Sequence, residues 1–153
     1  MKLSRALPLF AGLGLLALEA RGDAPSDQYA AFNSQDPTIT DNKTALVWER
    51  YAVVRTAGVA STHCNGLTLN GVPARLPTVK ELLTLVDEVP HDEFDGPRAI
   101  DRNAFPGTPI SAPFVTLGGD SKHNWVVHFD TGSVEMLTSL PTPLAVRCVY
   151  AKP

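Results

Sequence analysis

The chain has 153 residues, of which 44% are hydrophobic and 19% are charged, and its formal net charge is -3. This length suits one ordinary globular domain, and a composition with 11 glycines and 13 prolines excludes a coiled coil, a collagen-like rod and a fully disordered chain. The negative charge argues against a nucleic-acid binder, which needs a basic surface to neutralise phosphates.

Residues 1–22 have the three parts of a secretion signal in the expected order. Lys2 and Arg5 form a short positive end, an apolar run extends from Leu7 to Leu18, and Ala20-Arg21-Gly22 offers small residues for cleavage, with Ala20 as an alternative cleavage point. A retained membrane anchor needs about 20 apolar residues, and this run is shorter. We therefore expect an exported chain, secreted or periplasmic, with no stable membrane insertion after the signal is removed.

The cysteine count agrees with export. Cys64 and Cys148 are the two cysteines, and an even count in an exported chain favours a disulfide. A metal or redox pair is the alternative, but cysteines so far apart lack the short spacing of zinc knuckles and C-x-x-C enzymes. After the signal, we expect an extended leader over residues 23–37 and a folded domain over residues 38–151, in a mature chain whose net charge is -5.

The first predicted elements of the domain are a strand and a helix. Thr44–Arg50 follows a cluster of turn-forming residues and is predicted as a strand, with Trp48 in the core. Tyr51–Cys64 is ambiguous, but its apolar residues recur at helical spacing and predict a helix. Asn65-Gly66 then signals the helix end, with the glycine suited to a left-handed conformation.

Residues 78–87 carry the clearest helix signal. Thr78 can serve as the N-cap, and Glu81 three residues later completes a capping box. Arg75 and Glu81 could clamp a ligand, but we favour a structural interpretation, in which a cap and an ion pair fix the loop. The predicted buried face of this helix consists of Leu82, Leu83, Leu85 and Val86.

The rest of the chain is predicted as a long loop followed by β structure. Glu88–Gly107 is polar and punctuated by proline, and loops of this length are often functional. The turn Asp130-Thr131-Gly132 has the chemistry of a three-residue hairpin, and the last strand would bring Cys148 into the sheet. We predict strands at Pro113–Thr116, Asn124–Phe129, Ser133–Leu137 and Ala145–Tyr150.

Six fragments carry a further signal, in this order: Asp41-x-x-Thr44-x-Leu46-x-Trp48, Ala60-x-x-x-Cys64, Arg75-Leu76-Pro77-Thr78-x-Lys80-Glu81-Leu82, Ile100-Asp101-x-x-x-Phe105-Pro106, Trp125-x-Val127-x-Phe129-x-x-Gly132 and Val146-Arg147-Cys148-Val149. Together they resemble the Lcl C-terminal domain, a bacterial exported module. The resemblance implies an α+β, C-type-lectin-like fold, with two helices packed on a small twisted antiparallel sheet with long loops. It also implies pairing of Cys64 with Cys148, and a role in glycan binding and cell-surface attachment.

The sequence marks no catalytic, metal or cofactor site. The calcium-dependent sugar motifs Glu-Pro-Asn and Trp-Asn-Asp are absent, and a zinc site at His123 and His128 would lack a third ligand. The acidic residues of segment 87–101 could still bind calcium, although their spacing fits no EF-hand and a solvated loop is the default interpretation. These residues are Asp87, Glu88, Asp92, Glu93, Asp95 and Asp101.

We therefore expect a non-enzymatic binding module that recognises a glycan or another cell-surface ligand in attachment. A structural or assembly component of an exported cell-envelope complex is the alternative, and an enzyme with an unmarked active site is a third. The polar segments 88–109 and 117–124 should be exposed and should carry the ligand contacts, with Arg and Lys available to sulfate or carboxylate groups. The candidate ligand-binding residues are Asp92, Asp95, Arg98, Arg102, Asp120, Lys122, His123 and Asn124.

Overall fold

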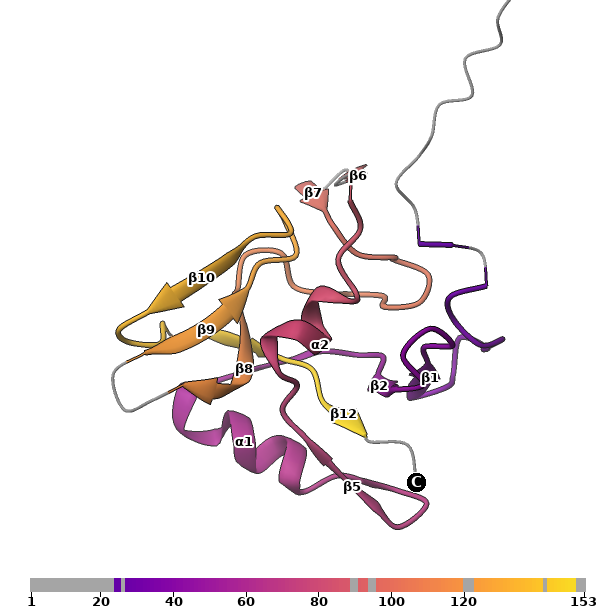
Figure 1. The fold of residues 1–153 in the computed structure, drawn as a ribbon, viewed down its shortest axis with the longest axis horizontal. Helices are drawn as coiled ribbons and strands as arrows, with labels where there is room; N and C mark the ends of the chain where they lie inside the picture. Colours follow the sequence, from indigo (N-terminus) through magenta and orange to yellow (C-terminus); the bar gives the residue numbers. More distant parts are fainter. Residues whose placement is uncertain are drawn as a thin grey trace, which may run out of the picture.

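The computed structural model describes residues 24–25, 27–88, 91–93, 96–119, 123–141 and 143–150, so the predicted signal lies outside it. Within the described residues the fold is mixed α+β and consists mostly of strands. Two short helices accompany two five-stranded sheets and a two-stranded hairpin (Figure 1). None of the helices in the described part of the chain is long and apolar enough to cross a membrane.

The first sheet is antiparallel. Trp48 is the middle residue of one of its strands. Its register places Trp48 opposite both Ile39 and Val149, and all three side chains are buried. In spatial order the strands are β1 (Thr38–Thr40), β2 (Val47–Glu49), β12 (Val149–Tyr150), β5 (Val72–Arg75) and β4 (Thr68–Leu69).

The second sheet is built around a hairpin and includes one parallel pair. The predicted hairpin is confirmed, with Gly132 in the left-handed conformation at φ 71°. The register between β8 and β9 shifts between Val115 and Gly119, and β8 runs parallel to β11. In spatial order the strands are β10 (Val134–Leu137), β9 (Asn124–Val127), β8 (Phe114–Gly119), β11 (Leu144–Val146) and β3 (Val53–Arg55).

Two of the chain's crossings between the sheets join consecutive strands directly, and one of them corrects the predicted strand over 145–150. That segment forms two strands, β11 and β12, which belong to different sheets. The break falls at Arg147, whose buried guanidinium donates to the carbonyl oxygens of Glu49 and Arg50 at 2.7 Å each. Glu49 and Arg50 belong to the other direct crossing, from β2 to β3, so these two crossings lie side by side.

Helix α1 (Ala57–Asn65) begins later than predicted. Val53–Arg55 is strand β3 rather than helix, because it pairs with β11, with Val54 opposite Ala145. The helix does end at Gly66, but this glycine has a right-handed conformation at φ -81° and ψ -7°, so the predicted left-handed stop is wrong. The N–H of Gly66 instead continues the helical hydrogen-bond pattern and donates to the carbonyl oxygen of Thr62 at 3.1 Å.

Helix α2 (Val79–Leu83) is shorter than predicted but has the predicted start. The Thr78 hydroxyl accepts the N–H of Glu81 at 3.2 Å, and the Glu81 carboxylate accepts the N–H of Thr78 at 2.7 Å, which confirms the capping box. Leu82 and Leu85 are buried, whereas Leu83 is exposed, so its predicted place on the buried face is wrong. Consecutive residues of a helix are rotated by about 100°, so Leu83 cannot share the buried face that Leu82 occupies.

Segment 88–107 is not one long loop. It includes a hairpin of β6 (His91–Glu93) and β7 (Gly96–Arg98), and then enters the core. Four of its apolar residues after the hairpin are almost fully buried, which overturns the expectation that the whole segment is exposed. They are Ala99, Ile100, Ala104 and Phe105.

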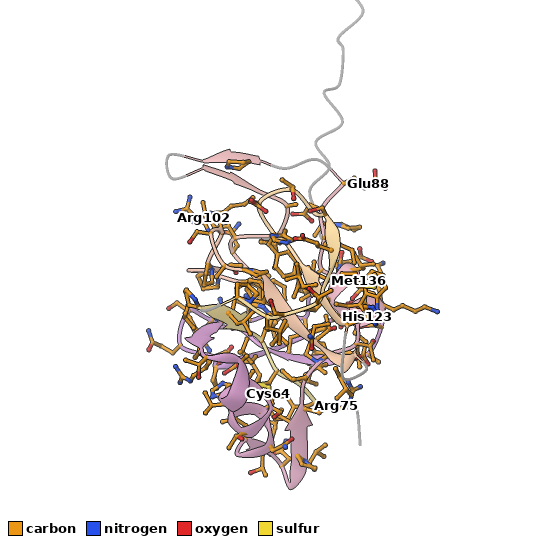
Figure 2. The ribbon with its side chains drawn as sticks, turned by 90° about the vertical axis from the view of Figure 1, so that its left-hand side faces the viewer. Cys64, Arg75, Glu88, Arg102, His123 and Met136 are labelled. Carbon is orange, nitrogen blue, oxygen red and sulfur yellow. A yellow bond between two sulfur atoms is a disulfide. The ribbon has the colours of Figure 1, made fainter. Side chains whose placement is uncertain are left out.

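The core has two neighbouring clusters. One contains Trp48, Leu82, Phe105, Phe114 and Phe129. The other surrounds the disulfide between Cys64 and Cys148, whose pairing is confirmed (Figure 2). This bond joins the end of α1 to the crossing between β11 and β12, so it ties the helix to both sheets.

Candidate functional site

The predicted contact residues do not gather on one surface. Figure 2 shows Arg102 and His123 on opposite sides of the molecule. Arg102 is exposed beyond β7, while His123 and Asn124 are half-buried at the start of β9. Asp92 lies in β6, and the remaining predicted residues Asp95, Asp120 and Lys122 fall outside the described residues.

Arg98 is buried rather than open to solvent. Its side chain is 7% exposed, and its Nη1 donates to the carbonyl oxygen of Thr108 at 2.5 Å. The prediction that this arginine is displayed on an exposed loop is therefore wrong. It holds segment 96–108 in place, and Arg102 remains as the exposed arginine of the described part of that segment.

A surface cavity of about 520 Å³ includes Arg102 in its wall. One wall comes from the segment that precedes β1, and the other from the turns after β7. Arg50, which directly follows β2, lies between these two walls. The lining residues are Phe32, Ser34, Arg50, Tyr51, Arg102, Asn103, Pro106 and Gly107.

Arg50 joins the two walls through its guanidinium. The side chain is 2% exposed, and its Nη1 donates to the carbonyl oxygens of Asn33 at 2.6 Å and Asp36 at 3.2 Å. On the other side, Nε donates to the carbonyl oxygen of Ala104 at 3.0 Å and Nη2 to that of Asn103 at 2.9 Å. Four charge-assisted hydrogen bonds from one rigid fork fix the floor of the cavity.

Two aromatic side chains stand at the cavity and are each partly exposed. Phe32 is 38% exposed and Tyr51 is 42% exposed. The guanidinium carbon of Arg50 lies 4.3 Å from the ring centroid of Phe32 and 5.5 Å from that of Tyr51, within cation–π range. The Tyr51 hydroxyl also donates to the carbonyl oxygen of Ser34 at 2.5 Å, so both rings have defined positions.

The segment that carries Phe32 is packed on the domain from residue 28 onward. Tyr29 pairs with Asp41 as an isolated β-bridge, and its ring meets Phe105 edge to face with centroids 5.2 Å apart. Burial raises the pKa of Tyr29 well above its usual range, and the nearby Asp41 adds to the effect. The Gln28 amide donates to the carbonyl oxygen of Thr84 at 3.2 Å.

The wall after β7 is supported from below by Arg147. Besides the two carbonyls described above, its guanidinium donates to the Thr108 hydroxyl at 2.8 Å and lies 4.5 Å from the ring centroid of Phe105. Burial lowers the pKa of Arg147 to about 9, while Glu49 favours the charged form, so the side chain stays protonated at neutral pH. Two buried arginines thus hold the backbone around this cavity.

Among the described residues that line the cavity, the charged side chains are positive and none is a carboxylate. Arg50 and Arg102 are its charged residues. The cavity can therefore offer hydrogen-bond donors and apolar ring surface at the same place. A ligand with hydroxyl or acidic groups on one side and C–H groups on the other would match both.

Other clusters in the described residues have structural explanations. Glu49, His63 and Cys148 place ligand-type atoms within 4.8 Å of one another, but the Cys148 sulfur is in the disulfide and supplies no thiolate. Arg75 and Glu81 form an ion pair that fixes the start of α2, which confirms the structural interpretation of this pair.

Sequence reasoning identified one lining residue, Arg102, and missed the other side chains. Phe32 and Ser34 fall in the predicted leader, and Tyr51 opens a segment predicted as helix. Arg50 ends a short strand, and nothing local distinguishes an arginine whose partners are backbone carbonyls. No sequence signal marks these residues, because distant segments decide that Arg50 is buried and that the rings of Phe32 and Tyr51 are partly exposed.

The chain belongs to the Lcl C-terminal domain family, whose model matches residues 37–150. The match covers the core, the disulfide and the wall after β7. Phe32 and Ser34 lie just before it, so part of the cavity comes from outside the family domain. No curated protein and no solved structure matches this chain.

Proposed function

We propose that this chain is an exported, non-enzymatic binding module that recognises a glycan or another cell-surface ligand in attachment. We place the ligand in the cavity above Arg50. The observation that carries the proposal is the pairing of two half-exposed rings, Phe32 and Tyr51, with exposed polar side chains around one cavity.

A sugar is the ligand class that best suits these groups. A pyranose ring has a face of C–H groups and an edge of hydroxyls, so it combines apolar surface with hydrogen-bonding groups. Aromatic rings can pack against the C–H face, and polar side chains can fix the orientation. Arg102 and Asn103 supply exposed polar groups, and an arginine suits carboxylate or sulfate substituents in particular.

Export and a C-type-lectin-like architecture are parts of the same proposal. The disulfide between Cys64 and Cys148 supports an oxidising compartment. The two helices, the small sheets and the pairing of the first helix with the end of the chain support the lectin-like architecture, which the sequence resemblance implied. No calcium or other cofactor takes part in the proposed binding.

An assembly role has one observation in its favour. Trp125 and Met136 face each other across β9 and β10 and are 41% and 51% exposed, and Leu117 on β8 is 48% exposed. Exposed apolar groups of this kind occur at protein contacts. Under this alternative, the outer part of the second sheet would meet another component of the cell envelope.

A glycan array probed with the mature chain tests the proposal. We expect selective binding that Arg102→Ala and Asn103→Ala each reduce by about tenfold, the loss of one charged or polar contact. Trp125→Ala is the matched control, since this exposed residue does not line the cavity. Loss of binding in Trp125→Ala with unchanged binding in both cavity variants would assign the function to the second sheet instead.

A further inference from the structure

We infer that the segment before the family domain, residues 28–36, is a working part of the ligand site, and that Phe32 is the residue that sets ligand specificity. This inference rests on the proposed function, because it concerns the same cavity. It adds that the family domain alone, residues 37–150, holds an incomplete site.

The segment is held near its start by contacts with the domain, and near its end it is closed by a turn of its own. Near its start, Tyr29 bridges to Asp41 and packs its ring on Phe105. Near its end, the Asn33 side chain and backbone N–H bond to the carboxylate of Asp36, both at 2.8 Å, and form a closed turn. Phe32 lies between these two anchors, so its place in the cavity wall is fixed.

The hydrogen bonds that Arg50 and Tyr51 make to this segment all go to its main chain. Arg50 binds the carbonyl oxygens of Asn33 and Asp36, and Tyr51 binds that of Ser34. Carbonyl oxygens are present whatever side chain a residue carries, so the side chain at position 32 can change while the wall stays in place. A wall with a constant backbone and exchangeable side chains is suited to setting specificity.

The surroundings of the Phe32 ring determine which part of it a ligand can contact. Arg50 covers one face of the ring at 4.3 Å, yet 38% of the residue is exposed, so the opposite face and the ring edge are what a ligand can meet. An aromatic face packs against flat apolar surface. We therefore assign Phe32 the C–H face of a pyranose ring, while the groups on the opposite wall meet its polar substituents.

Substitution at position 32 tests this directly. The mature chain, Phe32→Ala and Phe32→Tyr are compared on one glycan array, with Trp125→Ala as the control for loss of an exposed ring elsewhere. We expect Phe32→Ala to weaken binding by about tenfold or more and to change the ranking of the bound glycans. Phe32→Tyr keeps the aromatic face and should keep the ranking. Thermal melts of all four proteins establish that each is folded.

The outcomes separate this inference from the proposed function. If Arg102→Ala weakens binding but Phe32→Ala binds the same glycans with the same strength, the cavity is the site and the inference about Phe32 is wrong. Equal binding by all cavity variants would overturn both. A mature chain that binds no glycan would overturn this inference and the assignment of a sugar as the ligand. If Phe32→Ala loses binding because it has unfolded, Phe32→Leu replaces it, and a folded Leu variant with unchanged ranking overturns the inference.

Discussion

The carboxylate of Glu81 accepts a hydrogen bond from each terminal nitrogen of the Arg75 guanidinium, at 2.6 and 2.8 Å. The same carboxylate caps α2 by accepting the N–H of Thr78. One side chain therefore joins the end of β5 to the start of α2. The bond from Arg75 is the main reason that the pKa of Glu81 falls to about 2, with the N–H of Thr78 contributing in the same direction.

This pKa predicts how stability responds to acid. The folded-state pKa of Glu81 lies below the usual value of 4.5, so its contribution is complete above pH 4.5 and is lost as the pH falls toward 2. We expect Glu81→Gln to lower the free energy of unfolding by about 1–2 kcal/mol at pH 7, since solvent screens part of the ion pair. Urea unfolding across this pH range should show the two proteins converging near pH 2. A constant difference from pH 7 to pH 2 would contradict the assignment.

The disulfide should supply a large part of the stability. Cys64 and Cys148 are 84 residues apart, and closing a loop of that length is worth about 4–5 kcal/mol in the chain-entropy model. We expect Cys148→Ser to lose this amount in urea unfolding, and Cys64→Ser with Cys148→Ser to lose the same, which separates the missing cross-link from the effect of an odd thiol. Thiol titration of the denatured, unreduced chain should find no free thiol. Two free thiols in exported material would refute the pairing in the native protein.

Features set by neighbouring residues could be predicted from the sequence. The capping box of α2 depends on two residues three positions apart, Thr78 and Glu81, and it is found as predicted. The hairpin turn ending at Gly132 also depends on its own short segment. These elements need no information from the rest of the chain, because their hydrogen bonds close within a few residues.

Features set by distant residues could not be predicted in this way. Val53–Arg55 fits a helical pattern, but pairing with β11 makes it a strand. Arg50 and Arg147 are buried because backbone carbonyls from other segments meet their guanidinium groups, and no local pattern marks such an arginine. Since the candidate site depends on Arg50, the cavity could be found only from the structure.

Gly132 should tolerate substitution less well than another glycine with a similar backbone. A Cβ at Gly132 would lie 2.8 Å from Cγ1 of Val86, whereas one at Gly71 would meet nothing within 4 Å; both have positive φ, 71° and 81°. We expect Gly71→Ala to cost about 1–2 kcal/mol through backbone strain alone. Gly132→Ala should cost about 1–3 kcal/mol more, because the hairpin must move off Val86. Equal melting temperatures for the two variants would show that the hairpin turn moves away from Val86 at no cost in stability.

Processing of the N-terminus is a separate prediction. The positive end, apolar run and small residues of segment 1–22 predict a mature chain that begins close to Asp23. Mass spectrometry of the exported protein from its native host should find that N-terminus. An intact Met1 on membrane-bound material would contradict export with cleavage. The prediction matters for the site, because cleavage near Asp23 keeps Phe32 in the mature chain.

Arg147 should be among the most sensitive positions in the domain. It is fully buried and donates to two carbonyl oxygens at the crossing between the sheets and to the Thr108 hydroxyl. Arg147→Met keeps most of the side-chain volume but removes the donor from these buried acceptors. Leaving a buried acceptor without its hydrogen bond costs about 1–3 kcal/mol of stability. We expect a total loss of about 3–5 kcal/mol in urea unfolding.

Arg147→Lys is the matched control for this loss. Lysine keeps the positive charge but cannot reach two carbonyls and a hydroxyl with one planar fork. If the hydrogen bonds are what matters, the Lys variant should fall between the wild type and the Met variant. A Met variant as stable as the wild type would mean that removing the buried charge from a dry site offsets the lost bonds. In that case stability would not explain the buried arginine. Its role would then be to position the cavity wall that follows β7, through Thr108 and Phe105.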